Sequence, residues 1–361
     1  MPLVPAYIEN LEPYKPGGTI EEIQAKYGLS KIVKLASNEN PFGPSPKAVE
    51  AIQKVLGDIH RYPDAGGIKL REAIAKKHNV KVENVILGNG SEGIMSSIMR
   101  TFLVDNDELI SSSGSFIGFT VLANASGKKV TWVPLNKYRF DLQAMIPFIT
   151  PNTKIIYLCN PNNPTGTIFT KQEFDEFYKH VPERVLIILD EAYFEFAEEF
   201  PEYPNSMNYR YDNVITLRTF AKAHGLAGVR IGYGMAHDRL ITNLMKIKLP
   251  FEPNMLAQAA ALAAWNDDEF TKNYIENNRA SKSYFYSLFR ECGLTYIESY
   301  ANFVMLDLMK EEKVHHLHSE LLKRGVMVRP LKSFGIPNGL RVSTGRRDEN
   351  EFFAEQLKRI V

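Results

Sequence analysis

Apolar runs that alternate with helical segments constrain the fold of this chain more than any other feature. The runs KIIYLCN (154–160), VLIILD (185–190) and NVITL (213–217) are apolar at nearly every position, which is typical of strands buried on both faces. A helical segment, KQEFDEFYKHV (171–181), lies between the first two. Further strand-like runs are VILG (85–88), ELISSS (108–113), KVTWVPL (129–135) and IGYGMA (231–236). Strands that alternate with helices predict an α/β fold with a mainly parallel seven-stranded sheet covered by helices.

The pattern changes beyond residue 250. One long helix is predicted over 255–293, and the runs that follow are typical of a smaller α+β domain. These are the strand-like NFVMLDL (302–308), VMVRPL (326–331) and LRVSTG (340–345), and a closing helix over 349–361. The first 44 residues are rich in proline and predict an extended arm, after which Ser45 begins a helix. Because 361 residues exceed the usual size of one core, we predict an arm (1–44), a large domain (45–250) and a small domain (251–361).

Composition argues against several classes of protein. The formal net charge is +1 with dispersed Lys and Arg, so neither a nucleic acid nor a membrane surface is indicated as a partner. Two cysteines, Cys159 and Cys292, do not make a disulfide framework, and the N-terminus lacks an export signal, which together predict a cytoplasmic protein. No apolar run is long enough to span a bilayer. His315, His316 and His318 lie among charged residues, which favours a solvated helix over a metal site.

Lys222 is the first candidate for chemistry. It lies in VITLRTFAKAHGLAGVRIGYGMA (214–236), surrounded by alanine and glycine and followed by Arg230. A lysine on a tight loop of small residues is open to close approach and can act as an imine-forming nucleophile. Taken alone, a loop lysine is far more often a solvated residue than a nucleophile.

The turn GNGSEG (88–93) is the second candidate. It satisfies G-x-G-x-x-G between a strand and a helix, which permits a dinucleotide site and a nicotinamide-dependent dehydrogenase. That reading is weakened because the next strand ends in serines rather than in an acid. The helix N-terminus, with Gly90, Ser91 and Glu92, still suits a phosphate group of any kind. A merely tight turn is the structural alternative.

Polar residues at the ends of two apolar strands complete the set. Asn163 follows KIIYLCN in a Pro-Thr-Gly turn, and Asp190 ends VLIILD with Tyr193 just beyond. Each of these residues has a structural alternative, namely turn chemistry for the amide and a satisfied buried carboxylate for the acid. Because parallel strands present their carboxyl ends at one edge of a sheet, we expect these residues to meet Lys222 there. One ligand uses the whole set: pyridoxal 5'-phosphate, through its aldehyde, ring nitrogen, 3'-oxygen and phosphate.

The motifs KLASNENPFG, HRYPD, CNPNNPTG, DEAYFEF, RTFAKAHGLAGVRIGYG and GLRVSTG make the chain similar to the fold-type I aminotransferases, over nearly its whole length. Among these it most resembles the histidinol-phosphate aminotransferases. The resemblance implies that Lys222 carries the cofactor aldehyde, that Asp190 pairs with the ring nitrogen, and that Tyr193 holds the 3'-oxygen together with Asn163. The phosphate ligands it implies are Gly90, Ser91, Glu92, Thr219 and Arg230, with Tyr62 reaching the phosphate from the partner subunit of a homodimer.

The same resemblance implies a substrate site and a reaction. Arg341 is expected to bind the anionic group of the substrate, with Arg329, Tyr14 and Asn302 nearby. The implied reaction transfers an amino group from L-histidinol phosphate to 2-oxoglutarate in histidine biosynthesis, and an aromatic amino-acid aminotransferase remains the near alternative. Two departures from the family pattern affect the cofactor. Phe116 stands where a tyrosine usually stacks on the ring, and Ala221 replaces a serine that usually donates to the phosphate.

Overall fold

The structure is a computed structural model that describes residues 3–11, 18–209 and 211–361. Within these residues the main sheet has seven strands in the order β2-β8-β7-β6-β5-β3-β4. Strands β3 to β7 and β2 run the same way, whereas β8 is antiparallel to both of its neighbours, β2 and β7. The strands are β2 (Val85–Gly88), β3 (Glu108–Ser112), β4 (Lys129–Val133), β5 (Thr153–Cys159), β6 (Leu186–Asp190), β7 (Val214–Thr219) and β8 (Gly232–Met235). The predicted mainly parallel α/β sheet is confirmed.

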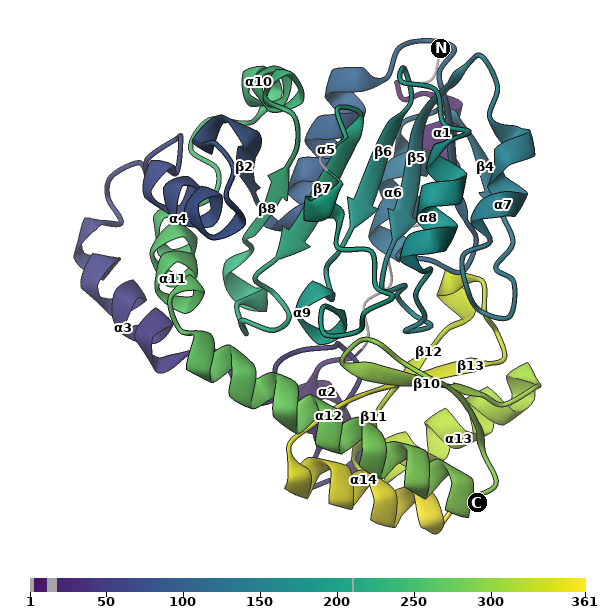
Figure 1. Cartoon of the computed structure of the whole chain (residues 1–361). Coiled ribbons are helices and arrows are strands. Elements are labelled where there is room, and N and C mark those ends of the chain that lie inside the picture. Colours follow the sequence, from purple (N-terminus) through teal and green to yellow (C-terminus); the bar gives the residue numbers. More distant parts are fainter. Residues whose placement is uncertain (1–2, 12–17, 210) are drawn as a thin grey trace.

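Helices cover both faces of this sheet (Figure 1), because alternate residues of each strand are apolar on either side. In β2, Ile86 packs in the core that includes α5, whereas Val85 and Leu87 pack in a second core with α3, α4 and α11. The helices before residue 250 are α1 (Ala6–Glu9), α2 (Ile20–Tyr27), α3 (Pro46–Val55), α4 (Ile68–His78), α5 (Gly90–Phe102), α6 (Ile117–Ala125), α7 (Leu142–Met145), α8 (Lys171–Tyr178), α9 (Phe194–Ala197) and α10 (Asp238–Ile247). Ser45 caps α3 as predicted, since its side chain accepts from the Lys47 backbone N–H.

A smaller α+β unit lies below the main sheet in Figure 1. Its antiparallel sheet has the order β12-β13-β10-β9, and β11 pairs in parallel with β1 of the N-terminal arm. The arm therefore adds a strand to this unit. The elements are β1 (Val33–Lys34), β9 (Thr295–Ile297), β10 (Phe303–Asp307), α13 (Glu311–Lys323), β11 (Val326–Met327), β12 (Arg329–Pro330), β13 (Gly339–Ser343) and α14 (Arg347–Lys358).

The single long helix predicted over 255–293 is wrong, because the structure has α11 (Met255–Trp265) and α12 (Asp268–Glu291) with a break between them. Asn266 and Asp267 occupy the break, and both residue types favour helix ends. The Asp267 carboxylate accepts from the Ser45 hydroxyl and from Lys47 Nζ, which ties the break to the start of α3. Because α11 packs in the core of the large domain, we propose that the small domain begins at Asp267 rather than at residue 251.

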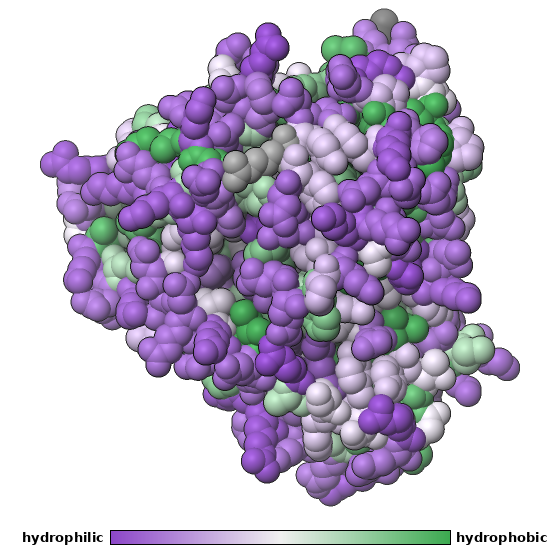
Figure 2. All heavy atoms as spheres, in the orientation of Figure 1, coloured by the Kyte–Doolittle hydropathy of each residue, from purple (hydrophilic) through white to green (hydrophobic). Residues whose placement is uncertain are grey.

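On the face that Figure 2 shows, hydrophilic side chains predominate and apolar ones lie in small separate groups. Among the helices of the described residues, none is long and apolar enough to cross a membrane.

Candidate active site

A cavity of about 220 Å³ lies at the carboxyl ends of β5, β6 and β7, against the first turn of α5. The parallel strands bring polar residues there from segments more than 100 positions apart. Its walls contain most of the residues predicted from the sequence: Gly90, Ser91, Glu92, Phe116, Asn163, Asp190, Tyr193, Thr219, Lys222 and Arg230. Lys222 and Asp190 line the same cavity, so the expectation that they lie at the same edge of the sheet is confirmed.

Lys222 follows β7 and reaches into this cavity. Burial lowers the pKa of its ammonium to about 8, and the neighbouring Arg341 guanidinium acts in the same direction. The ammonium lies 5.6 Å from the centre of the Tyr193 ring. A lysine with a pKa near 8 exposes a sizeable fraction of neutral amine near physiological pH, which suits both nucleophilic attack and proton transfer.

Asp190 is 2 % exposed at the end of β6 and accepts two hydrogen bonds. The Tyr157 hydroxyl donates to Oδ2 at 2.7 Å, and the Ala192 backbone N–H donates to Oδ1 at 3.2 Å. Burial raises the pKa of the carboxyl to about 6, while the Tyr157 bond lowers it. The carboxylate is thus available to a cationic partner in the cavity.

Tyr193 is buried and held from the N-terminal arm. Asn38 Nδ2 donates to its hydroxyl at 2.9 Å, and the Ser343 hydroxyl donates to Asn38 Oδ1 at 2.6 Å. Asn38 has a positive φ of 55°, a conformation that asparagine tolerates better than most residues. One short asparagine therefore links the arm, strand β13 and the tyrosine at the cavity.

A second cavity, of about 520 Å³, adjoins the first and shares Phe116, Asn163 and Lys222 with it. We call the first the inner cavity and the second the outer cavity. Its outer wall carries three cationic side chains, Lys34, Arg329 and Arg341. Arg341 is buried on β13 and donates from Nη2 to the Ala36 carbonyl at 2.8 Å. Its Nη1 donates to Asn163 Oδ1. This second contact orients the Asn163 amide so that its Nδ2 is the donor left for the inner cavity.

Two glycines shape the cradle at the first turn of α5: Gly232 of β8, and Gly90, whose positive φ of 71° favours glycine. A Cβ on Gly232 would lie 2.6 Å from the Ser91 backbone nitrogen, and a Cβ on Gly90 would lie 3.0 Å from Arg230 Nη2. Arg230 reaches across the turn and donates to Glu92 Oε2 at 3.2 Å. N–H groups at a helix N-terminus next to a guanidinium fit a phosphate group. The inner cavity therefore offers donors at one end and a lysine and a carboxylate further in, a donor set that fits pyridoxal phosphate.

The remaining predicted residues lie in different places. Arg329 lines the outer cavity. Tyr62 is 79 % exposed and stacks on Phe251 with ring centres 4.3 Å apart, away from the cavity of its own chain. Asn302 lies behind the wall, where its amide donates to the Asn38 carbonyl and the Tyr274 hydroxyl. Tyr14 lies outside the described residues.

Tyr157, Asn38 and Lys34 contact or line the site and were not predicted from the sequence. Tyr157 lies within an apolar strand, where a tyrosine is read as core. A tyrosine two positions before the end of the strand was the signal that could have indicated a contact with the site, because a buried tyrosine hydroxyl needs a hydrogen-bond partner. Asn38 and Lys34 lie in the arm, whose course over the protein surface the sequence does not reveal.

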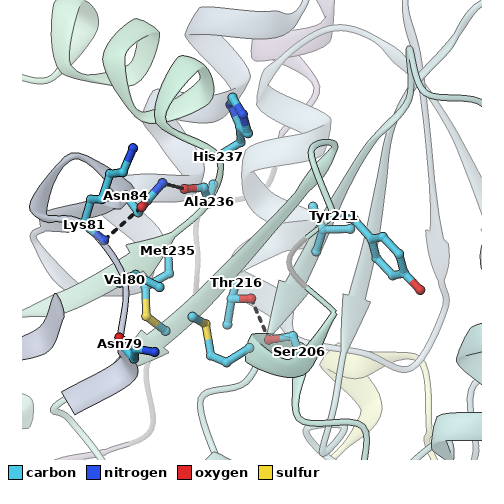
Figure 3. Close-up of a pocket in the computed structure, with 12 residues that line it drawn as sticks. Asn79, Val80, Lys81, Asn84, Ser206, Tyr211, Thr216, Met235, Ala236 and His237 are labelled. Carbon is cyan, nitrogen blue, oxygen red and sulfur yellow. Dashed lines mark hydrogen bonds between the residues drawn. The ribbon is translucent and has the colours of Figure 1, made fainter. Parts of the chain in front are cut away.

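A third cavity, of about 460 Å³, lies near the amino end of β7 and the carboxyl end of β8 (Figure 3). The hydroxyls of Ser206 and Thr216 form a hydrogen bond in its wall, and Met235 and His237 also line it. It lies at the opposite edge of the sheet from Lys222. None of the candidate residues lines it.

Comparison with known proteins shows the family of the chain. The sequence model of the family Aminotransferase class I and II matches residues 30–357. The chain belongs to this family and is an aminotransferase, which decides against the dehydrogenase reading of the glycine-rich turn.

Individual relatives of the chain carry the name histidinol-phosphate aminotransferase. The chain is 41% identical over 356 residues to histidinol-phosphate aminotransferase 2 of Carboxydothermus hydrogenoformans, with 98% of each chain covered. It is 42% identical over 357 residues to histidinol-phosphate aminotransferase of Moorella thermoacetica, covering 98% of this chain and 92% of that one. Among solved structures, histidinol-phosphate aminotransferase from Sinorhizobium meliloti in complex with pyridoxal-5'-phosphate is similar with a TM-score of 0.89 and 26% identity, covering 100% of this chain and 99% of that chain. The fold-type I architecture is therefore confirmed.

Proposed function

We propose that this protein is a pyridoxal-phosphate-dependent histidinol-phosphate aminotransferase. It would transfer the amino group of L-histidinol phosphate to 2-oxoglutarate, giving imidazole acetol phosphate and L-glutamate in histidine biosynthesis. The observation that carries the proposal is the pair of adjoining cavities, which share Lys222, with Asp190 in the inner one and two arginines in the outer one. About 40% identity to relatives of that name over nearly the whole chain supports the choice of substrate.

The inner cavity would hold the cofactor. When bound, pyridoxal phosphate supplies an electron sink that acidifies a hydrogen on the carbon bearing the substrate amine. The first turn of α5, Thr219 and Arg230 would hold the phosphate, and Phe116 would cover the ring. Asn163 Nδ2 and the Tyr193 hydroxyl would donate to the 3'-oxygen. Ala221 offers no hydroxyl to the phosphate, so the affinity depends more on Arg230 and Ser91.

Two side chains of the inner cavity would handle charge and protons. Asp190 would face the ring nitrogen and stabilise its protonated form, which buried carboxylates do well when their partner is a cation. Lys222 would bind the cofactor aldehyde, and its released Nζ could take a proton from the substrate carbon and return it. Without cofactor, burial lowers the pKa of Lys222 to about 8, so that part of its Nζ is a neutral amine able to attack the aldehyde near neutral pH.

The outer cavity would hold the substrate. Histidinol phosphate has no α-carboxylate, so Arg341 would meet its phosphate in one half-reaction and a carboxylate of glutamate in the other. Arg329 and Lys34 line the same cavity and add positive charge to it. Lys34 also donates to Glu39 at 2.9 Å, so part of its charge is already balanced.

Substrate turnover tests the proposal. The reconstituted protein is assayed with histidinol phosphate and with phenylalanine, each with 2-oxoglutarate as acceptor. A higher kcat/KM for histidinol phosphate is expected. Better use of phenylalanine would replace the proposal with an aromatic amino-acid aminotransferase, which the same Arg341 could serve through a carboxylate.

We further propose a cytoplasmic homodimer with shared active sites. Tyr62 projects from its own chain together with Phe251, and Ile59 of the same loop is also exposed. Exposed stacked aromatic rings are typical of protein interfaces. In a dimer, this loop would bring Tyr62 to the phosphate end of the partner's cavity. Free Cys159 and Cys292 are compatible with a reducing compartment.

A further inference from the structure

Tyr157 occupies a position from which it contacts the carboxylate of the inner cavity. It lies on β5 next to β6, where Cys159 pairs with Asp190 in register. Side chains two residues apart on a strand share a face, so Tyr157 points to the same face as Cys159 and reaches along the strand to Asp190. Its hydroxyl donates to Asp190 Oδ2 at 2.7 Å.

The ring of Tyr157 is fixed independently of its hydroxyl. The side chain is fully buried, and the ring stacks on Phe119 of α6 with centres 3.9 Å apart and planes 6° apart. Stacking of this kind contributes through the ring alone. The direction of the hydroxyl toward Asp190 is therefore set by packing and does not depend on the cavity contents.

The surroundings of Asp190 explain why a donor is needed. Burial raises the pKa of the carboxyl to about 6, and the nearby Glu92 acts in the same direction, whereas Tyr157, the Ala192 N–H and Lys222 lower it. Cys159 and Tyr193 also line this cavity, and burial raises the pKa of both groups, which keeps them neutral. Burial likewise raises the pKa of Tyr157 well above its usual value, so its hydroxyl remains a donor throughout the neutral range.

We propose that Tyr157 is a positioning residue, which holds the Asp190 carboxylate ionised and aimed at the ring nitrogen of the cofactor. The inference rests on the proposed function, because it assigns a supporting role within the same site. Tyr157 touches Asp190 and not the reacting atoms. Its effect passes through one hydrogen bond, to a group that burial would otherwise tend to neutralise.

The variant Tyr157→Phe removes the hydroxyl and keeps the ring stacked on Phe119. Because a hydrogen bond to a charged group is lost, the dissociation constant of pyridoxal phosphate is expected to rise about tenfold. The acid limb of the pH profile of kcat/KM is expected to move up by roughly one pH unit, since Asp190 then protonates more easily. Tyr178→Phe is the matched control, because the Tyr178 hydroxyl donates to Asn213, which lies at the amino end of β7 and so at the opposite end of the strand from Lys222. It should leave both quantities unchanged.

A double-mutant cycle separates a role through Asp190 from a role in packing. In an Asp190→Asn background, Tyr157→Phe should change cofactor affinity less than twofold, because the charge that its hydroxyl supports is gone. An equal effect of Tyr157→Phe in both backgrounds, or a single variant with wild-type affinity and pH profile, would overturn the inference. Failure of the wild-type protein to bind pyridoxal phosphate would instead overturn the proposed function.

Discussion

Arg341 donates a hydrogen bond from its guanidinium to the side-chain oxygen of Asn163, joining strand β13 of the four-stranded sheet to the loop after β5. The same guanidinium donates to the Ala36 carbonyl of the N-terminal arm at 2.8 Å. Three segments that are distant in sequence therefore meet at one side chain. Because Asn163 lines both cavities, Arg341 can bind an anion in the outer cavity while orienting an amide of the inner one.

We expect Arg341→Lys to weaken substrate binding. Lysine keeps the charge but cannot hold two acceptors in a fork, so KM for histidinol phosphate and for glutamate should rise about 10- to 100-fold, with a smaller fall in kcat. Steady-state kinetics with each substrate measures the effect. Arg324→Lys, on the surface of α13 beside Glu320, is the control and should behave as wild type. An unchanged KM for both substrates would remove Arg341 from the anion site.

Lys222→Ala should abolish transamination, with a loss of more than about a thousandfold, since both the attachment point and the proton carrier are removed. In the wild type, borohydride reduction in the presence of pyridoxal phosphate should label Lys222, as read by peptide mass spectrometry. The neutral amine is the reactive form, so the rate of labelling should rise with pH and level off above a pKa of about 8. Lys246→Ala, in α10, is the control variant. Labelling that persists in Lys222→Ala but is lost in Lys246→Ala would place the linkage at Lys246 and not at Lys222.

Asp190→Asn should stabilise the cofactor-free protein at neutral pH while weakening cofactor binding. The folded-state pKa of about 6 lies above the usual 3.8, so the stability that Asp190 contributes is fully present below the unfolded pKa and is lost as pH rises through 6. At pH 7 the ionised carboxylate therefore costs up to about 3 kcal/mol, which the amide avoids. Urea unfolding without cofactor at pH 7 and pH 5 measures the gain, which should be smaller at pH 5. A less stable variant at pH 7 would contradict the expectation.

Hybrid dimers test whether Tyr62 serves the partner's site. Tyr62→Ala and Lys222→Ala are expected to be weak or inactive alone. When they are co-refolded in equal amounts, each hybrid dimer should contain one intact site, and activity should recover to about one quarter of wild type for random pairing. No recovery, with dimers present by size-exclusion chromatography, would place Tyr62 in its own subunit's site, whereas a Tyr62→Ala homodimer as active as wild type would place Tyr62 outside both sites.

Much of the site could be predicted from residues at strand ends. Asp190 ends an apolar strand, and Asn163 and Lys222 follow two others, so the rule that parallel strands share one carboxyl edge brings them together before any packing is known. The positions of Tyr157 and Asn38 could not be predicted in this way. The role of Tyr157 depends on which way an aromatic ring packs, and Asn38 depends on where a proline-rich arm lies.

The sequence by itself determined the alternation of strands and helices, the helix start at Ser45 and the residues that meet around Lys222. These are local properties, since apolar periodicity and turn chemistry are encoded within short stretches. The tertiary structure alone decided the hydrogen bonds from Ser45 and Lys47 to Asp267, the bond from Arg341 to Asn163 and the bond from Tyr157 to Asp190. Each of these depends on contacts between segments far apart in the chain, whose geometry is fixed only when the hydrophobic cores pack.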